Sequence, residues 1–404
     1  MLRALAAGQW DESWLPFAVA LAHHCFVNEY VFAQAPEEQA LVAKLERPDA
    51  SPAQLAMLGA YAPLHRFAWA AELPDREWPA EISGLLTRQI SEPLAEKALC
   101  RAMPRLTAIE GGVSQAVRDQ YEANPYPRWV RFGEHSMADS IAAVLGGPPL
   151  NLPLKDYVSP AAPDILIAGC GTGQQSLQCA GRFAKARILA VDLSLASLAF
   201  ASRMTGKLGM ANIKYAQADI MALDTLDRRF DLIECVGVLH HLADPEAGWR
   251  ILSGLLRPGG VMKIRLYSEA ARQDVVAGRA LIVERGYEPS PGGIRHCRQD
   301  IAELARKGNA EMTRLSQRDS FFTTSECRDL LFHVQEHRFD LSRIEAALHA
   351  LKLNFLGFEF SGHPGPRRRW PSGATSRPRI RKPSPACTNS GFRRIIPRSA
   401  NKDP

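Results

Sequence analysis

Short apolar runs alternate with longer amphipathic stretches along the middle of the chain, and this alternation predicts an α/β fold. Each run is apolar almost throughout, which suits a strand buried on both faces of a parallel sheet. Glycines, acids or prolines then end the runs abruptly. The five runs are Asp164–Ala168, Arg187–Asp192, Ile213–Asp219, Phe230–Val236 and Val261–Tyr267.

A sixth apolar run, Leu353–Phe360, follows only after a long helical stretch at about residues 269–351. Within that stretch, Arg272–Glu284 and Asp300–Ala305 have helical spacing, and the segment Pro289–Gly293 predicts a loop between them. We therefore predict a mostly parallel sheet of six to seven strands with a helical insertion before the sixth strand. This part of the chain spans residues 136–362.

Apolar residues also recur at roughly helical spacing near the start of the chain, and residues 1–115 predict a helical N-terminal domain. Ser51 followed by Pro52 has the pattern of a helix N-cap and first helical residue. No repeat of about 34 residues is evident, so tetratricopeptide units are not predicted here. The adjacent His23, His24 and Cys25 would point to different faces of a helix, which favours packing over metal binding.

The net charge of +6 is concentrated at the end of the chain. Residues 363–404 hold nine arginines and two lysines against one aspartate, with eight prolines and no helical or strand period. We predict a disordered basic tail with no seventh strand in it. Clustered arginines could contact nucleic acid non-specifically, and a change of reading frame would produce the same composition. Nucleic acid is otherwise not an expected partner.

Composition excludes several other classes. The chain has 404 residues, is 46% hydrophobic and contains no uninterrupted apolar run long enough for a membrane span. No cationic leader with a cleavage site is evident, and the eight cysteines form no C-x-x-C pair. These observations predict a cytoplasmic protein with reduced thiols and no membrane partner.

The first apolar run ends in three glycines at alternate positions, Gly169, Gly171 and Gly173. Such glycines allow a tight turn and a close approach of the backbone to a ligand, and the following helix presents free N–H groups. A nucleotide-like cofactor is therefore predicted at this loop. The dinucleotide pattern G-x-G-x-x-G would require glycine at the position of Gln174, which disfavours a nicotinamide cofactor.

Acidic residues follow the next two runs. Asp192 stands at the distance downstream expected of a carboxylate that accepts hydrogen bonds from both ribose hydroxyls. Asp219 ends the third run, where a lone aspartate is also a common helix N-cap. Since the carboxyl ends of parallel strands share one edge of a sheet, both acids and the glycine loop are predicted to meet there.

The pattern G-x-G-x-G, the two acids, Val238–Leu242 after the fourth run and Arg257-Pro-Gly-Gly260 before the fifth resemble class I S-adenosylmethionine-dependent methyltransferases. The resemblance covers about residues 120–360. It implies a Rossmann-like sheet, S-adenosyl-L-methionine as cofactor, and Asp219 as acceptor from the adenine amino group. The cofactor contacts that it implies are Gly169, Cys170, Gly171, Thr172, Gly173, Asp192, Leu193, Asp219, Ile220 and Val236, joined by Tyr121.

A narrower resemblance, carried by Gln120–Trp129 and Cys327–Phe339, is to bacterial methyltransferases often fused to tetratricopeptide repeats. Elsewhere in the superfamily an acid usually stands two residues before the first glycine, where it helps orient the methionine amine. This chain has Ile167 there. The means by which it binds the amino-acid end of the cofactor therefore stays open.

Residues 116–135 are predicted as a connector. Two prolines within Tyr121–Trp129 constrain the residues before them to extended conformations, which predicts a stiff segment rather than a helix. It is either an interdomain linker whose aromatic residues dock on the sheet, or a strap across the cofactor pocket with Tyr121 and Arg128 near the ligand.

For catalysis, His240 and His241 are the candidate bases, because they follow the fourth strand and histidine titrates near neutrality. The methyl acceptor is an unidentified small molecule or protein. Alternatives are a non-catalytic cofactor-binding scaffold and a nicotinamide-dependent oxidoreductase. No metal is predicted, although His333 and His337 have helical ligand spacing. The insertion offers candidates for the acceptor pocket, with exposed ion pairs as the alternative: Arg295, His296, Arg298, His333, Glu336, His337 and Arg338.

Overall fold

A twisted sheet of seven strands forms the centre of the protein in the computed structural model, which describes residues 1–133, 138, 140–148, 150–154, 157–359 and 392–397. The strand order is β3-β2-β1-β4-β5-β7-β6. The five central strands are parallel and follow the predicted runs: β1 (Asp164–Ala168), β2 (Arg187–Asp192), β3 (Ile213–Gln217), β4 (Phe230–Val236) and β5 (Leu256–Leu266). The Rossmann-like prediction is confirmed.

Both faces of the sheet are covered, which explains why its strands are apolar throughout rather than alternating. Leu166 and Ala168 of β1 belong to one buried cluster, and Ile165 and Ile167 belong to the other. The first face carries α11 (Pro245–Gly254) and α16 (Leu341–Ala350), and the second carries α8 (Ile141–Gly146), α9 (Gln174–Arg182) and α10 (Leu195–Lys207).

The strand order reverses between β1 and β4, since β2 and β3 extend the sheet on one side and the later strands extend it on the other. Loops leaving β1 and β4 therefore diverge and open a crevice at the carboxyl edge of the sheet.

Arg257 holds the opposite edge together, because its guanidinium donates to Asp231 (2.5 Å) and Asp164 (2.8 Å). The predicted turn at residues 257–260 is part of β5, and the pairing of β4 with β5 shifts in register there.

The prediction of a wholly disordered tail is wrong for one segment. β7 (Phe392–Pro397) lies between β5 and β6 (Gly357–Glu359) and is antiparallel to both. The edge of β5 would otherwise expose unpaired backbone groups, so a distant segment without a local strand signal supplies them. β6 is shorter than the predicted run Leu353–Phe360. Residues 360–391 and 398–404 of the predicted tail lie outside the described part.

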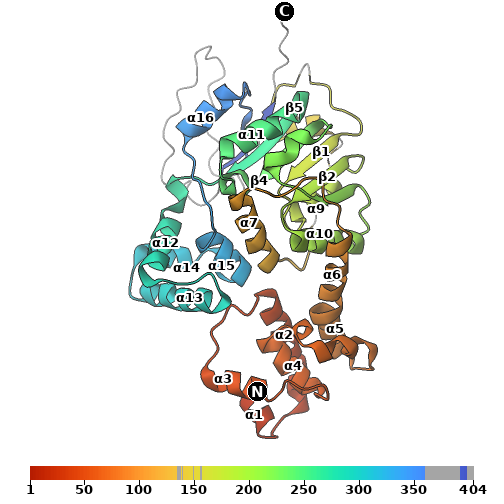
Figure 1. Ribbon diagram of the computed structural model, residues 1–404, viewed down its shortest axis with the longest axis vertical. Coiled ribbons are helices and arrows are strands. Elements are labelled where there is room, and N and C mark those ends of the chain that lie inside the picture. The colour runs from red at the N-terminus through yellow and green to blue at the C-terminus, as the bar shows by residue number, and fades with distance from the viewer. Residues whose placement is uncertain (134–137, 139, 149, 155–156, 360–391, 398–404) are drawn as a thin grey trace, which may run out of the picture.

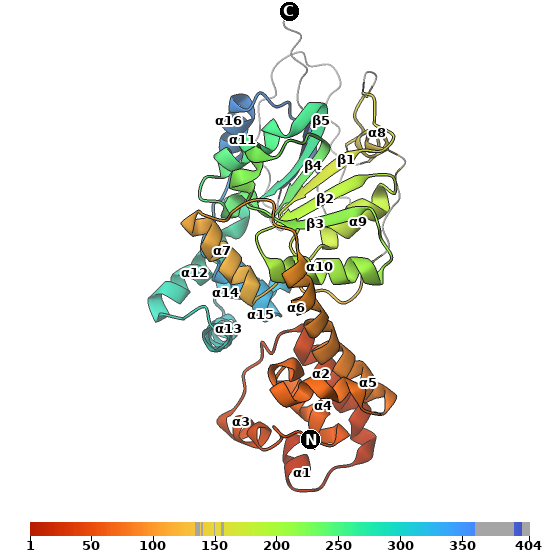
Figure 2. The ribbon, with the colours of Figure 1, turned by 45° about the vertical axis from the view of Figure 1, so that its right-hand side comes forward.

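The N-terminal helices lie below the sheet in Figures 1 and 2 and enclose their own buried cluster. The predicted cap at Ser51 is confirmed, because its hydroxyl accepts from the Gln54 amide (3.3 Å) at the start of α4. The helices are α1 (Leu2–Ala6), α2 (Leu15–Val27), α3 (Pro36–Ala43), α4 (Pro52–Tyr61), α5 (Ala80–Leu86) and α6 (Glu92–Ala102), with a π-helical turn at Thr87–Ser91.

α7 (Gly112–Ala123) crosses the boundary predicted at residue 115, and the predicted connector is helical up to Ala123. The two prolines of the connector restrict only Asn124 and Tyr126, the residues directly before them, so nothing prevents helix formation upstream.

The helical insertion forms a separate layer beside the sheet with its own buried cluster (Figures 1 and 2). Its helices are α12 (Gln273–Arg285), α13 (Pro291–Arg306), α14 (Ala310–Ser316) and α15 (Thr324–Leu331). The predicted loop 289–293 is shorter than expected, because Ser290 caps α13 by accepting from the Gly293 amide (3.1 Å) and Pro291 begins the helix. None of the described helices is long and apolar enough to cross a bilayer.

Candidate functional site

A cavity of about 440 Å³ lies at the carboxyl edge of the sheet, where the loops after β1, β2, β3 and β4 meet α7 and the insertion. Ten of the residues predicted from the sequence line it: Tyr121, Gly169, Cys170, Gly171, Asp192, Leu193, Asp219, Ile220, Val236 and His241. Thr172, Gly173 and His240, also predicted, do not line it.

The three glycines all have left-handed backbone angles, with φ of 76°, 52° and 83°. An added Cβ at Gly171 would lie 2.7 Å from the carbonyl oxygen of Tyr126, and one at Gly173 would lie 2.6 Å from the Cβ of Ala201. The groups that leave no room for a side chain at Gly171 and Gly173 thus belong to the protein's own connector and to α10. These contacts explain why Gly173 packs behind the loop rather than facing the cavity.

Thr172 holds the connector. Its amide donates to the carbonyl of Tyr126 (3.3 Å), its hydroxyl donates to the carbonyl of Pro127, and its own carbonyl accepts from the Trp129 indole (3.2 Å). Residues 126–129 are therefore a strap fastened to the glycine loop. Arg128 turns away from the cavity to pair with Glu29 (3.3 Å). Of the two residues predicted near the ligand, only Tyr121 therefore lines the cavity.

Asp192 lies half-buried beside the glycine loop. One carboxylate oxygen accepts from the Gly171 amide (2.8 Å) and the other from the Ser194 amide (3.0 Å). Burial raises the pKa of Asp192, and the nearby charge of Glu122 adds to that effect while the two amides oppose it. Glu122 itself accepts from the Leu195 amide (2.5 Å) at the start of α10.

Asp219 combines the two roles considered for it. Its carboxylate accepts from the Met221 amide (2.9 Å) and caps the short helix Ile220–Thr225, and the residue also lines the cavity. Its own amide donates to the Thr107 hydroxyl (2.8 Å), which fixes the segment before α7 against β3. One carboxylate oxygen is left for a ligand.

On the other side of the cavity, Tyr121, His241 and Asp329 face one another. The Tyr121 hydroxyl donates to the Asp329 carboxylate (2.6 Å) and lies 3.2 Å from Nε2 of His333. The Gln335 amide donates to Nδ1 of His333 (3.1 Å), so Nε2 of that ring carries the hydrogen and donates to Tyr121. A chain of hydrogen bonds thus runs from His333 to Asp329.

His241 contributes an acceptor nitrogen to the cavity. Its Nδ1 lies 2.7 Å from the Gln335 carbonyl, and since a carbonyl only accepts, Nδ1 carries the hydrogen and Nε2 does not. Burial lowers the pKa of His241 to about 3, so the ring is neutral at physiological pH.

The prediction of His240 as a base is not supported by its position. His240 is fully buried, does not line the cavity, and neither ring nitrogen has a partner within the described chain. Its ring stacks on Tyr267 with centroids 3.6 Å apart, and burial lowers its pKa well below the usual value. Adjacent residues in a tight turn point in different directions, so only one of the pair reaches the cavity.

Asp329 is a cavity acid that no sequence pattern predicted. It is buried in α15, and burial raises its pKa to about 6 in spite of the hydrogen bond from Tyr121 and the positive charge of Arg272. Arg272 is held by a two-pronged contact with Glu336 (3.0 and 2.7 Å) and stacks over Tyr267. Asp329 is an isolated acid in a helix, and only the packing of α15 against α7 brings it to Tyr121.

Most insertion residues proposed for the acceptor pocket serve elsewhere. Arg295 donates to the carbonyl of Tyr30 (2.7 Å) and Arg298 to that of Val31 (2.9 Å), which ties the insertion to the N-terminal helices. His333 and Glu336 lie behind the cavity and orient residues that line it. The cavity lining excludes the whole set Arg295, His296, Arg298, His333, Glu336, His337 and Arg338.

His241, Asp329 and His333 bring their ligand atoms within 4.8 Å of one another, as in a metal site. The imidazoles of His241 and His333 stack at 3.6 Å with 17° between their planes. Nitrogen lone pairs lie in the ring plane, so two stacked rings cannot both point at one ion. The geometry favours hydrogen bonding over metal binding at this cluster.

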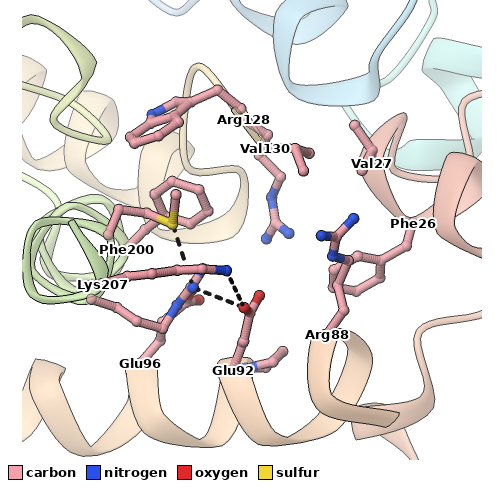
Figure 3. A pocket seen from close by; sticks show the side chains of 13 residues that line it. Phe26, Val27, Arg88, Glu92, Glu96, Arg128, Val130, Phe200 and Lys207 are labelled. Atoms are coloured by element: carbon pink, nitrogen blue, oxygen red, sulfur yellow. Dashed lines mark hydrogen bonds and ion pairs between the residues drawn. The ribbon is translucent and has the colours of Figure 1, made fainter. Parts of the chain in front are cut away.

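A second, smaller cavity of about 40 Å³ separates the N-terminal helices from α10 (Figure 3). Ion pairs fill much of it, because Arg203 contacts Glu92 (3.2 Å) and Glu96 (2.8 Å). Arg88 and Arg128 point toward one another across it. Of the predicted site residues only Arg128 lines this cavity, so the larger one is the candidate functional site.

Comparisons with known proteins point to the same part of the chain. Residues 165–260 match a family model described as "Methyltransferase domain". An uncharacterized protein of Synechococcus sp. is 29% identical over 297 residues, which cover 68% of this chain and 66% of the relative. A trans-aconitate 2-methyltransferase of Deinococcus radiodurans is 39% identical over 134 residues, covering 32% of this chain and 47% of that enzyme.

The chain thus spans less than two thirds of the length of these curated relatives. Among solved structures, PKMT2 from Rickettsia typhi in complex with AdoHcy matches with a TM-score of 0.43 at 19% identity, covering 60% of this chain and 49% of that one.

Replacing Gly171 with alanine is expected to destabilise the protein by about 1–3 kcal/mol, because it adds a clash with the Tyr126 carbonyl to an unfavourable backbone angle. Gly209→Ala is the matched control, since Gly209 also has positive φ (67°) but nothing within 4 Å of an added Cβ. Chemical unfolding of both variants would measure the difference. Equal losses of stability would show that the strap does not press on the loop.

Asp329 holds its proton more tightly in the folded protein than in the unfolded chain, since its pKa rises from 3.8 to about 6. The stability contributed by this group is therefore greatest below about pH 4 and declines as the pH rises to about 6. Asp329→Asn should remove that decline, which is on the order of 2 kcal/mol. Urea unfolding at about pH 4.5 and 6.5 measures this change in the free energy of unfolding, with the exposed Asp224→Asn as control. The same change with pH in wild type and in Asp329→Asn would contradict the raised pKa of Asp329.

Proposed function

We propose that this protein is an S-adenosylmethionine-dependent methyltransferase that moves a methyl group directly to an acceptor in the cavity. The observation that carries the proposal is that loops from four successive strands meet in one cavity, with the glycine loop and two acids in the predicted places. The methyltransferase domain match over residues 165–260 supports it independently.

The residues present fit this cofactor. Asp192 has accepted one backbone amide on each oxygen, and a carboxylate has about four acceptor positions, so it retains capacity for two ribose hydroxyls. Asp219 keeps one oxygen for the adenine amino group. Ile220 lines the cavity next to it and offers an apolar surface to the base. When bound, the cofactor supplies an electrophilic methyl group on a sulfonium.

The protein's own part in the reaction is alignment, exclusion of water and management of one proton. Tyr121, Tyr126 and Tyr267 wall the acceptor side of the cavity. Asp329 is largely ionised at neutral pH, and His241 presents an unprotonated nitrogen. Either group can accept the proton that a hydroxyl, amine or carbon acid loses on methylation, and the pKa of Asp329 makes it the better base.

The acceptor is inferred to be a small molecule. A cavity of about 440 Å³ is within the range that encloses small ligands, and it must hold the cofactor as well. The relative from Deinococcus radiodurans is named for a small carboxylic acid, trans-aconitate. We also propose that the protein is related to methyltransferases often fused to tetratricopeptide repeats. The segments that carry this likeness are Gln120–Trp129 and Cys327–Phe339. Incubation of cell extract with methyl-labelled cofactor would reveal the acceptor fraction.

Replacing Asp192 with alanine is expected to weaken binding of S-adenosylmethionine by about 10-fold or more, because charge-assisted hydrogen bonds to the ribose are lost. Isothermal titration calorimetry would measure the affinity, and a melting curve would verify the fold. Asp224→Ala, an exposed aspartate outside the cavity, is the control. Unchanged affinity in a folded Asp192→Ala variant would rule out this binding mode.

A further inference from the structure

The cavity contains a buried acid that takes no part in holding the adenosyl group or in accepting the proton. Glu234 of β4 is 6% exposed and lines the cavity. Its hydrogen-bond donor is the neutral side-chain amide of Gln175 (2.5 Å), and no cation of the described chain lies within ion-pair distance. Lys263 stands opposite Glu234 in the sheet register but pairs with Glu359 (2.7 Å). An uncompensated buried carboxylate is costly unless a ligand completes it.

A cation with no ion-pair partner among the described residues stands on the strand next to this acid. Arg265 of β5 follows Lys263 by two residues, so its side chain projects from the same face of the sheet, nearer the carboxyl edge. It lines the cavity, and its Nε is buried without a hydrogen-bond partner among the described residues. Val236 of β4 is its neighbour in the register. Glu234 and Arg265 thus occupy adjacent strands, and neither has an ion-pair partner among the described residues.

Glu234 lies next to the strand that carries the glycine loop. Glu234 pairs in register with Ile167, which stands two residues before Gly169. Residues in register on neighbouring parallel strands project to the same side and lie about 4.8 Å apart. Glu234 therefore lies one strand away from the position where related methyltransferases carry an acid and this chain does not. Gln175, which contacts Glu234, belongs to the first turn of α9, directly after the loop.

We propose that Glu234 and Arg265 bind the two ends of the amino-acid group of S-adenosylmethionine, Glu234 the ammonium and Arg265 the carboxylate. This assignment rests on the proposed function and names residues for the part of the cofactor that Ile167 leaves unbound. An ammonium offers donors to a carboxylate, and a guanidinium forms a two-pronged contact with a carboxylate. A zwitterion would compensate both buried charges at once, which a singly charged ligand would not.

Other cations of the cavity fit this role less well. Arg272 and Arg318 are each held by a carboxylate, Glu336 and Asp274 respectively. Arg182 has no ion-pair partner among the described residues, but it stands at the end of α9, eight residues after Gln174 and about 12 Å farther along the helix axis. Arg182 therefore provides a control with the same charge in the same cavity, distant from the glycine loop.

The test compares ligands that differ only in the amino-acid group. Calorimetry is carried out with S-adenosylmethionine, with its decarboxylated form, and with 5′-methylthioadenosine, which lacks the whole group. Arg265→Gln should weaken S-adenosylmethionine by about 10-fold or more and leave the other two ligands nearly unchanged. Glu234→Gln should weaken S-adenosylmethionine and the decarboxylated form but not methylthioadenosine. Arg182→Gln should change none of them, and Arg265→Lys should restore part of the loss.

The outcomes separate this inference from the proposed function. If wild-type protein binds none of the three adenosine compounds, the proposed function fails. If wild type binds S-adenosylmethionine but Arg265→Gln and Glu234→Gln weaken all three ligands equally, or none of them, the assignment of the two residues is overturned. Melting curves identify any variant that fails to fold, and because the readout is a ratio between ligands on one variant, a partial loss of folded protein does not imitate the expected result.

Discussion

The glycine loop after β1 is clamped between two parts of the chain, and the cavity depends on that clamp. Asp192 accepts the Gly171 amide from one side, while the carbonyl of Tyr126 fills the space where a Cβ would stand on the other. A loop held in left-handed conformations by both contacts cannot relax when a ligand leaves. The cofactor side of the cavity is therefore pre-organised, and the strap that closes it also fixes Tyr121 at the end of α7.

The cavity also holds three acidic side chains whose charges are compensated to different degrees. Glu234 and Asp329 are buried and Asp192 is half-buried, and the three acids differ in the groups that compensate their charge. Asp192 has two backbone amides, Asp329 has a tyrosine hydroxyl, and Glu234 has a neutral amide. An unpaired polar group costs more free energy in a low-dielectric site than in water. The least compensated carboxylate is therefore the one that a ligand of opposite charge would stabilise most. Under the proposed function, this ordering assigns Asp192 to the ribose, Asp329 to the proton and Glu234 to the ammonium group of the cofactor.

Local patterns predicted the strands, the glycine loop and the acids at the strand ends, because each depends on residues close together in the chain. The errors have a common cause. His240 and His241 are adjacent and chemically identical, and only the turn after β4 decides that one is buried against Tyr267 while the other faces the cavity. β7 has no local strand signal, but its pairing with β5 satisfies backbone groups from a distant part of the chain. Asp329 carries no motif at all.

Apolar periodicity and the spacing of glycines and acids by themselves determined a parallel sheet with a nucleotide-binding edge, since those features arise from backbone geometry within single βα units. Tertiary structure alone decided which charges face each other across the cavity. Glu234 and Ile167 lie 67 positions apart yet share a sheet level, and Tyr121 and Asp329 meet although 208 positions separate them. Such contacts follow from strand order and helix packing, which no local pattern encodes, and they set the chemistry of the site.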